Sequence, residues 1–251
     1  MRVQAAAFAV ADGAPVVVPW SEPGCAGERL RCASLLKPLL FWVAADAFAG
    51  RDAWAAAASQ AVLVSANDPM VALWERLGAP ELLGRLAAVT GCEWPLEPGG
   101  PRSFGRVLVT AAQVAAAYAE LGAAAQREDE RAAQVLAWMR RVPDRQAFGA
   151  RRAAAAALGV GEEAVAVKTG WFLDQDERRL RTHAVTITAL PGGTLRGSAV
   201  LTALPAPDGL PAQYAREYVH GDEVLHHHRA LAGDAIVAAT HAALEVDPGA
   251  D

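Results

Sequence analysis

The sequence has few of the features that mark membrane proteins or nucleic-acid-binding proteins. None of its apolar runs approaches the roughly 18 consecutive residues that a membrane-spanning helix needs. Lys and Arg number 23 against 28 Asp and Glu, a net charge of −5, whereas binding to a phosphate backbone requires clustered positive charge. We therefore expect neither a membrane nor a nucleic acid as a partner.

Cysteine is also scarce, with Cys25, Cys32 and Cys92 alone in the chain. An odd number without a C-x-x-C pair indicates neither a disulfide framework nor a zinc knuckle, and a Cys25–Cys32 bridge has no support. Cys32 precedes Ser34 by two residues, but no neighbouring residue marks its thiol as activated. We expect that thiol to be buried and neutral.

The N-terminal segment lacks the pattern of a strong export signal. Its only early basic residue is Arg2, and the apolar run over residues 5–11 is short and rich in alanine. Asp12 and Gly13 then separate two apolar stretches, which predicts a strand, a tight turn and a second strand. We interpret these residues as the first hairpin of the folded domain and expect a cytoplasmic location.

Beyond the hairpin, the pattern predicts a block of helices followed by strands. Helices are expected at about 34–48, 53–63, 69–78, 80–90, 111–122, 129–141 and 232–245, and strands at about 165–170, 182–190 and 197–204. This order predicts an α+β fold in which helices flank an antiparallel sheet and an all-helical lobe is inserted. We expect one domain over 1–251, with an α/β lobe of about 1–33 and 142–251 and a helical lobe of about 34–141.

Three short motifs combine residue types that suit acyl transfer. They are Ser34-Leu35-Leu36-Lys37, Ser65-Ala66-Asn67 and Lys168-Thr169-Gly170. Ser and Lys three positions apart share one face of a helix, so the amine of Lys37 can reach the hydroxyl of Ser34. A serine hydroxyl needs such a base to become a nucleophile, and burial beside a second cation favours the neutral amine that accepts its proton. Lys37 also lies among leucines, where a charged side chain without a partner or a function would be unfavourable.

In type and order, the motifs resemble those of the serine β-lactamase and penicillin-binding-protein superfamily, which carries S-x-x-K, S-x-N and K-T-G. The resemblance extends over most of residues 1–204, including the helix that begins after Thr110. It implies that Ser34 is the nucleophile, that Ser65 relays a proton between the lysines and the leaving group, and that the backbone N–H groups of Ser34 and Trp171 stabilise the oxyanion. It further implies that Asn67 holds the substrate amide, that Lys168 and Thr169 bind a substrate carboxylate, and that Gly170 lies in the substrate site.

The sequence departs from the family pattern in two places. Ser34 and Ser65 are 65 − 34 = 31 residues apart, about half the interval of typical penicillinases, which predicts a reduced helical lobe. Class A enzymes also use a loop glutamate in an E-x-x-x-N setting to activate the deacylating water. Here the loop offers Glu93 and Glu97, neither of which has an Asn four residues later. Glu97 is the better positional match, although solvated loop glutamates are the simpler interpretation.

Two further groups of residues are weaker candidates. Arg181 and His183 start the strand after the Lys-Thr-Gly motif, where some family members bind the substrate carboxylate with an arginine, although a surface role serves equally well. The run of His226, His227 and His228 suggests a metal site. However, three adjacent side chains on a regular helix cannot all face one ion, and the sequence shows no accompanying ligand cluster. We expect no metal and no cofactor.

The sequence therefore predicts a serine hydrolase that forms an acyl-enzyme through Ser34, with a β-lactam or a related amide as its small-molecule substrate. The first alternative is a cytosolic esterase, amidase or transacylase of a small metabolite, since peptidoglycan lies outside the cytoplasm. The second alternative is a degenerate member that binds a ligand without turnover. The oligomeric state does not follow from these patterns.

Overall fold

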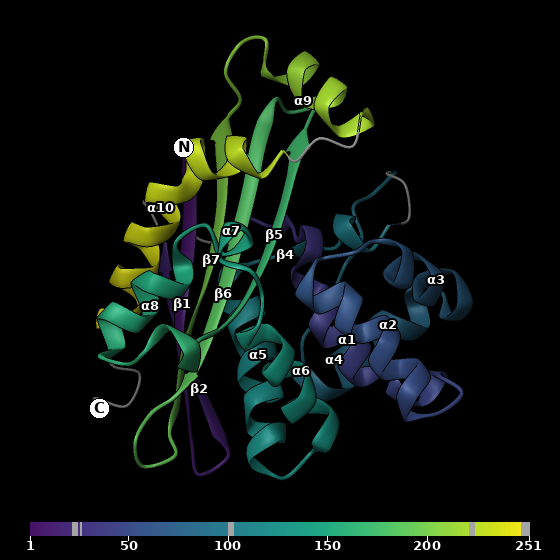
Figure 1. The fold of residues 1–251 in the computed structure, drawn as a ribbon, viewed down its shortest axis with the longest axis vertical. Helices are drawn as coiled ribbons and strands as arrows, with labels where there is room; N and C mark the ends of the chain where they lie inside the picture. The colour runs from purple at the N-terminus through teal and green to yellow at the C-terminus, as the bar shows by residue number, and fades with distance from the viewer. Residues whose placement is uncertain (22–24, 26, 100–102, 221–223, 247–251) are drawn as a thin grey trace.

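The protein is built on a five-stranded antiparallel sheet with the strand order β2-β1-β7-β6-β5. The computed structural model describes residues 1–21, 25, 27–99, 103–220 and 224–246. The strands are β1 (Arg2–Ala11), β2 (Ala14–Ser21), β5 (Ala166–Asp174), β6 (Arg179–Ala189) and β7 (Leu195–Pro205). The first two strands and the last three strands thus form one sheet, because β1 pairs with β7 (Figure 1).

Strand β1 is buried on both faces, which explains its nearly continuous apolar sequence. Ala6, Phe8 and Val10 face the larger hydrophobic core, whereas Val3, Ala5 and Ala7 face a second core. Asp12 and Gly13 at its end have φ angles of 52° and 76°, as both central residues of a type I′ turn require. The predicted hairpin is confirmed.

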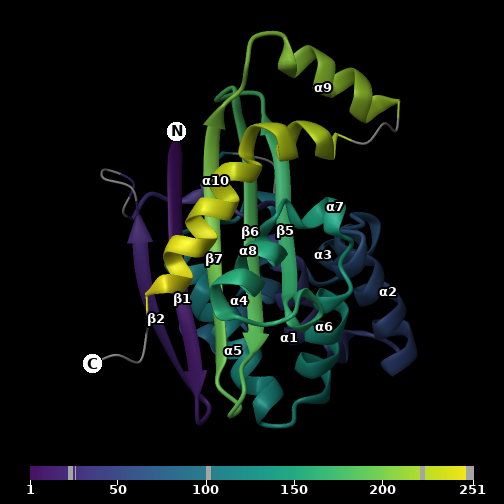
Figure 2. The same ribbon diagram turned by 60° about the vertical axis from the view of Figure 1, so that its left-hand side comes forward.

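The helices lie on both faces of the sheet and to one side of it. They are α1 (Lys37–Val43), α2 (Arg51–Leu63), α3 (Asp68–Leu77), α4 (Ala79–Thr90), α5 (Ala111–Gln126), α6 (Glu130–Arg140), α7 (Asp144–Ala147), α8 (Ala150–Leu158), α9 (Leu210–Val219) and α10 (Leu225–Glu245). Helix α5 packs on one face, and α8 and α10 cover the other (Figure 2). The predicted α+β architecture is confirmed. The lobe boundaries stay a prediction, since α5 contacts both the sheet and the neighbouring helices.

The helix predicted over 34–48 is shorter and begins differently. A 3₁₀ turn, η1 (Ala33–Leu36), precedes α1, and the N–H of Lys37 bonds to the carbonyl of Ser34. An α-helical bond to that carbonyl would need an N–H from residue 38, which is Pro38 and has none. The turn that contains Ser34 is therefore closed by a 3₁₀-type hydrogen bond between residues three apart.

Two small features were missed by the sequence patterns. A two-stranded sheet joins β3 (Leu30–Arg31) to β4 (Leu108–Val109) beside η1, and α9 stands between β7 and α10. The last helix also begins at Leu225 rather than at about residue 232. Among the residues that the structure describes, no helix is both long and apolar enough to cross a membrane.

Candidate active site

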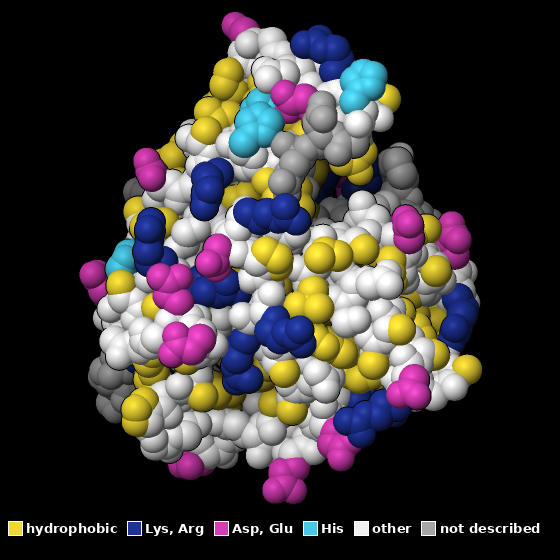
Figure 3. Space-filling model, in the orientation of Figure 1, with side chains coloured by type: hydrophobic (Ala, Val, Ile, Leu, Met, Phe, Trp, Pro, Cys, Tyr) yellow, Lys and Arg dark blue, Asp and Glu magenta, His cyan; other side chains and the backbone are white. Residues whose placement is uncertain are grey.

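A cavity of about 720 Å³ brings residues of the predicted motifs together. Ser34, Ser65 and Asn67 line it, together with Trp171 from the strand that carries the Lys-Thr-Gly motif. Helix α9 forms the opposite wall, and Figure 3 shows the surface hollowed beneath it. The remaining lining residues are Arg31, Ala33, Ser103, Phe104, Gly105, Arg106, Phe172, Leu173, Asp174, Gln175, Asp176, Tyr214, Ala215, Tyr218 and Val219.

Ser34 sits in the η1 turn, and neighbouring segments hold that turn from two sides. The Tyr118 hydroxyl of α5 donates to the carbonyl of Leu35 at 2.7 Å. On the other side β5 lies so close that a Cβ at Gly170 would be 2.8 Å from the Ser34 nitrogen. Only glycine allows this approach. The structure thus gives Gly170 a steric role beside the predicted nucleophile.

Lys37 is completely buried, and its amine faces the Ser65 loop. Its Nζ donates to the Ser65 carbonyl at 2.5 Å and to Oδ1 of Asn67 at 2.7 Å. Burial lowers the pKa of Lys37 from 10.5 to about 7, because a low-dielectric environment disfavours the charged form. The Lys37 amine therefore has a substantial neutral fraction at neutral pH, which any proton acceptor requires.

Lys168 approaches Ser65 from β5. It is also completely buried, and its Nζ donates to the Ser65 hydroxyl at 2.9 Å. Burial, and then the charge of Lys37, lower the pKa of Lys168 well below its ordinary value. Ser65 therefore lies between two amines, with its carbonyl bound to one and its hydroxyl to the other. The chain contains only these two lysines among its 23 basic residues, a signal for the site that the motif analysis overlooked.

Two residues near these amines have backbone φ angles in the left-handed region. Ser65 has a φ of 59°, and Ala33, which precedes Ser34, has a φ of 52°. Side-chain-bearing residues rarely adopt this left-handed region, and such strained positions cluster at functional sites. The strain thus falls next to both serines of the predicted motifs.

Thr169 and Trp171 differ in what they present to the cavity. The Thr169 hydroxyl is buried and donates to the Gln146 carbonyl at 2.7 Å, so it does not face a ligand. Trp171 lines the cavity and packs edge-on against Phe148, with ring centroids 5.8 Å apart. Its strand, β5, is at the edge of the sheet, where alternate N–H groups point away from the neighbouring strand.

Glu97 does not join the cluster of serines and lysines. Arg31 donates to its carboxylate at 2.6 Å, and so does Arg106 at 2.6 Å. The hydrogen bond from Arg31, above all, lowers the pKa of Glu97, and a carboxylate held in this way is a weaker base. Glu93 is exposed, and neither glutamate lines the cavity. This geometry argues against Glu97 as the deacylation base.

Arg181 and His183 are both buried, so the surface role considered for them is wrong. Arg181 donates to Asp174 at 3.2 Å and to Glu177 at 2.7 Å, and it does not line the cavity. The ring of His183 is bonded to the carbonyl of Arg31 at 2.9 Å, and burial lowers its pKa to about 4. Both side chains thus support the cavity wall from behind and do not face the ligand space.

Cys32 behaves as expected from the sequence. It is fully buried, its Sγ lies 3.2 Å from the Phe104 carbonyl, and burial raises its thiol pKa. The thiol is therefore neutral. Arg31 and Arg106, by contrast, line the cavity together with Asp174 and Asp176 and were not singled out from the sequence, because ion-paired arginines carry no short motif.

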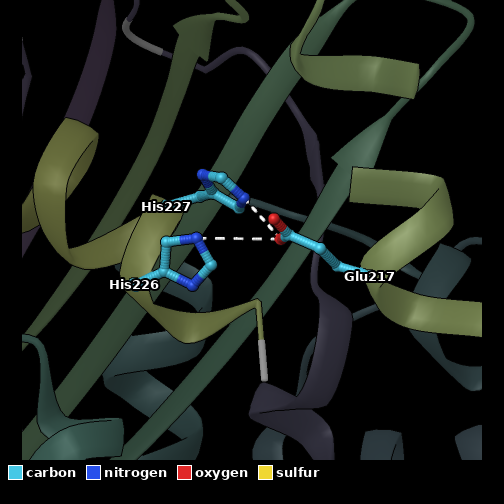
Figure 4. Close-up of side chains that lie close together, drawn as sticks. All are labelled: Glu217, His226 and His227. Atoms are coloured by element: carbon cyan, nitrogen blue, oxygen red, sulfur yellow. Dashed lines mark hydrogen bonds and ion pairs between the residues drawn. The ribbon is translucent and has the colours of Figure 1, made fainter. Parts of the chain in front are cut away.

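The three adjacent histidines separate into two groups. His228 turns inward, where its ring bonds to Thr182 at 2.8 Å and to Tyr214 at 3.1 Å. His226 and His227 turn instead toward Glu217 on α9 (Figure 4). The sequence pattern did not place an acidic residue near these histidines, and the structure brings one to them from another helix.

Among the comparisons with known proteins, the one with solved structures identifies the fold. No protein-family model and no curated protein matches the chain. Among solved structures, a TLA-1 extended-spectrum β-lactamase variant aligns over 96% of this chain and 92% of its own, with a TM-score of 0.64 and 12% identity. A variant of GNCA4, the last common ancestor of Gram-negative bacteria class A β-lactamase, aligns over 97% and 91%, with a TM-score of 0.62 and 18% identity. TLA-3 extended-spectrum β-lactamase aligns over 82% and 86%, with a TM-score of 0.59 and 13% identity.

The chain has the class A β-lactamase fold. The alignments cover 82–97% of the chain, so the fold expected from the motif resemblance is confirmed. Similarity at 12–18% identity describes architecture alone, and the chemistry of this chain has to be argued from its own residues.

Proposed function

We propose that this β-lactamase-like protein is a serine hydrolase that forms an acyl-enzyme through Ser34, with a β-lactam or a related amide as substrate. One observation carries the proposal: Ser34 shares a cavity with Ser65 and Asn67, to which the buried amines of Lys37 and Lys168 are bonded. Two buried lysines that have no carboxylate partner among the described residues are costly for stability, which favours a chemical role over a structural one.

In the proposed reaction, the neutral amine of Lys37 takes the hydroxyl proton of Ser34 as Oγ forms a bond to the substrate carbonyl. The N–H groups of Ser34 and Trp171 receive the negative charge that develops on the carbonyl oxygen. The C–N bond then breaks, and the leaving nitrogen takes a proton from the Ser65 hydroxyl. The Ser65 hydroxyl regains the proton that Lys37 took from Ser34, so the transfer is balanced, and Lys168, which donates to that hydroxyl at 2.9 Å, holds it in place.

Deacylation is the slower half of the proposed cycle. The carboxylate of Glu97 is engaged by Arg31 and Arg106 and does not line the cavity, so it is poorly placed to activate water. We therefore expect the acyl-enzyme to persist, or to pass its acyl group to an acceptor other than water. Within the first alternative from the sequence, a cytosolic esterase, amidase or transacylase of a small metabolite, this favours the transacylase.

A second observation favours that alternative. The two residues expected to bind a substrate carboxylate, Lys168 and Thr169, are fully buried and bonded to Ser65 and Gln146. A substrate without a carboxylate beside its reactive carbonyl fits the cavity better. Activated esters therefore belong among the first compounds to test.

The deciding experiment is intact-protein mass spectrometry after brief incubation with a penicillin, a chromogenic cephalosporin and a nitrophenyl ester, with Ser34→Ala as the control. We expect a covalent adduct on the wild type alone, lasting for minutes with at least one compound. A short-lived adduct with rapid ring opening would indicate an efficient β-lactamase. Equal labelling of Ser34→Ala, or no adduct from any compound, would contradict the proposal and favour a ligand-binding protein.

A further inference from the structure

Glu217, His226 and His227 converge at the junction between α9 and α10 (Figure 4). One ligand atom from each lies within 4.8 Å of the others. The Nε2 atoms of His227 and His226 are 2.6 and 3.7 Å from Oε2 of Glu217. Successive helical residues point about 100° apart, yet these two imidazole centroids are only 3.8 Å apart.

The donor set matches the preferences of a first-row divalent metal ion. Imidazole nitrogen and carboxylate oxygen together suit zinc and its neighbours, whereas magnesium and calcium prefer oxygen alone. Ligands of tetrahedral zinc lie ~2.0–2.1 Å from the ion and hence ~3.3 Å from one another. The two separations from Glu217, 2.6 and 3.7 Å, bracket that value, and the two imidazole nitrogens lie within 4.8 Å of each other, so side-chain rotations bring the three atoms into place.

The surroundings provide both an entry path and an outer shell. The side chain of His226 is 57% exposed, whereas those of Glu217 and His227 are 19% and 11% exposed. An ion can therefore enter from the solvent past His226. The other carboxylate oxygen of Glu217 accepts a hydrogen bond from Gln213 at 2.8 Å, the kind of support that orients a metal ligand.

We propose that Glu217, His226 and His227 bind a divalent metal ion of the zinc type, which links α9 to the first turn of α10. The fourth position is left to water. Tyr218 and Val219, next to Glu217 on α9, line the cavity that holds Ser34. The ion therefore secures the helix that forms one wall of the candidate active site, but binding itself does not depend on the proposed acyl transfer.

The test is titration calorimetry of the tag-free full chain with zinc chloride at pH 7.5. We expect one zinc ion per chain and no binding of magnesium. His226→Ala and His227→Ala each lose at least tenfold in affinity, and Gln213→Ala loses about 10–100-fold through the outer shell. His241→Ala, a histidine variant on the same helix, keeps the wild-type affinity. Zinc at 100 times its Kd raises the melting temperature of the wild type by about 5–10 °C.

Two results would overturn the proposal. One is the absence of zinc binding to the wild type, which would leave the cluster as an ion pair between the helices. The other is unchanged zinc affinity in His226→Ala, which would place the ion elsewhere. Because the His226 side chain is largely exposed, that variant should fold, and circular dichroism verifies this even if His227→Ala proves unstable.

Discussion

At the scale of single residues, Ser65 is constrained both by its backbone angle and by its hydrogen bonds. It accepts hydrogen bonds from Lys37 and Lys168 while its φ angle is 59°. Its loop thus presents the carbonyl to one amine and the hydroxyl to the other. The neighbouring Asn67 adds a neutral oxygen beside Lys37, which binds the amine without supplying the full negative charge that would hold it protonated.

We predict that the rate of acylation rises with pH through about 7. Burial lowers the pKa of Lys37 to about 7, and the neutral amine that accepts the Ser34 proton accumulates above that value. Asn67→Asp should move the midpoint upward by about one pH unit or more, because an adjacent carboxylate favours the ammonium form. Stopped-flow acylation rates from pH 5 to 9 measure this. Asp68→Asn, an exposed neighbour, is the control, and an unmoved midpoint in Asn67→Asp would mean that another group titrates.

The motifs predicted which residues lie near the site, but not which of their polar groups face the cavity. Ser34 and Lys37 are three positions apart in one short segment, and Ser65 lies in a loop, so the sequence alone already restricts where they lie. Which groups face the cavity depends instead on tertiary partners that the sequence does not reveal. The Thr169 hydroxyl turns to Gln146, and Glu97 is taken by two arginines.

At the scale of elements, most helices and strands follow the sequence patterns closely, and the exceptions have local causes. Pro38 removes the donor that an α-helical first turn would need. Helix α9 was overlooked although Gly209 and Pro211 mark its start and Leu210 and Tyr214 share its buried face. A ten-residue helix with so short an apolar face gives a weak periodic signal.

Two glycines in regular elements should respond oppositely to substitution by alanine. Gly197 in β7 pairs with Phe8, and a Cβ there would lie 2.3 Å from the Phe8 ring and from the Thr186 carbonyl. We expect Gly197→Ala to lower the free energy of unfolding by about 2–3 kcal/mol. Gly84 in α4 has open space around it, so Gly84→Ala should raise that free energy by about 0.5–1 kcal/mol. Urea unfolding of both variants tests this, and equal effects would contradict the packing described for β7.

At the scale of the whole molecule, the buried amines tie stability to pH. Between about 7 and 10.5, Lys37 is neutral in the folded protein and still charged in the unfolded chain. The unfolded state then binds more protons, so the free energy of unfolding rises with pH across this window. Lys168, whose pKa is also lowered, acts in the same direction.

We therefore expect chemical denaturation between pH 7 and 10 to show stability increasing with pH. Lys37→Met removes one of the two titrating amines and should flatten this rise. It should also abolish acylation, which separates the stability effect from the catalytic one. An unchanged slope in Lys37→Met would show that the amine is not perturbed in the folded protein.

The pairing of β1 with β7 has a consequence for how the chain folds as it is made. Arg2 is opposite Ala203, so the inner edge of the first hairpin has no partner until some 200 residues have been synthesised. At 5–20 residues per second, that interval is ~10–40 s. Throughout it, the edge of the apolar strand β1 has no partner, and such an edge is the kind of surface on which nascent chains associate wrongly. The rate of translation and the supply of chaperones should therefore govern the yield of native protein more than its final stability does.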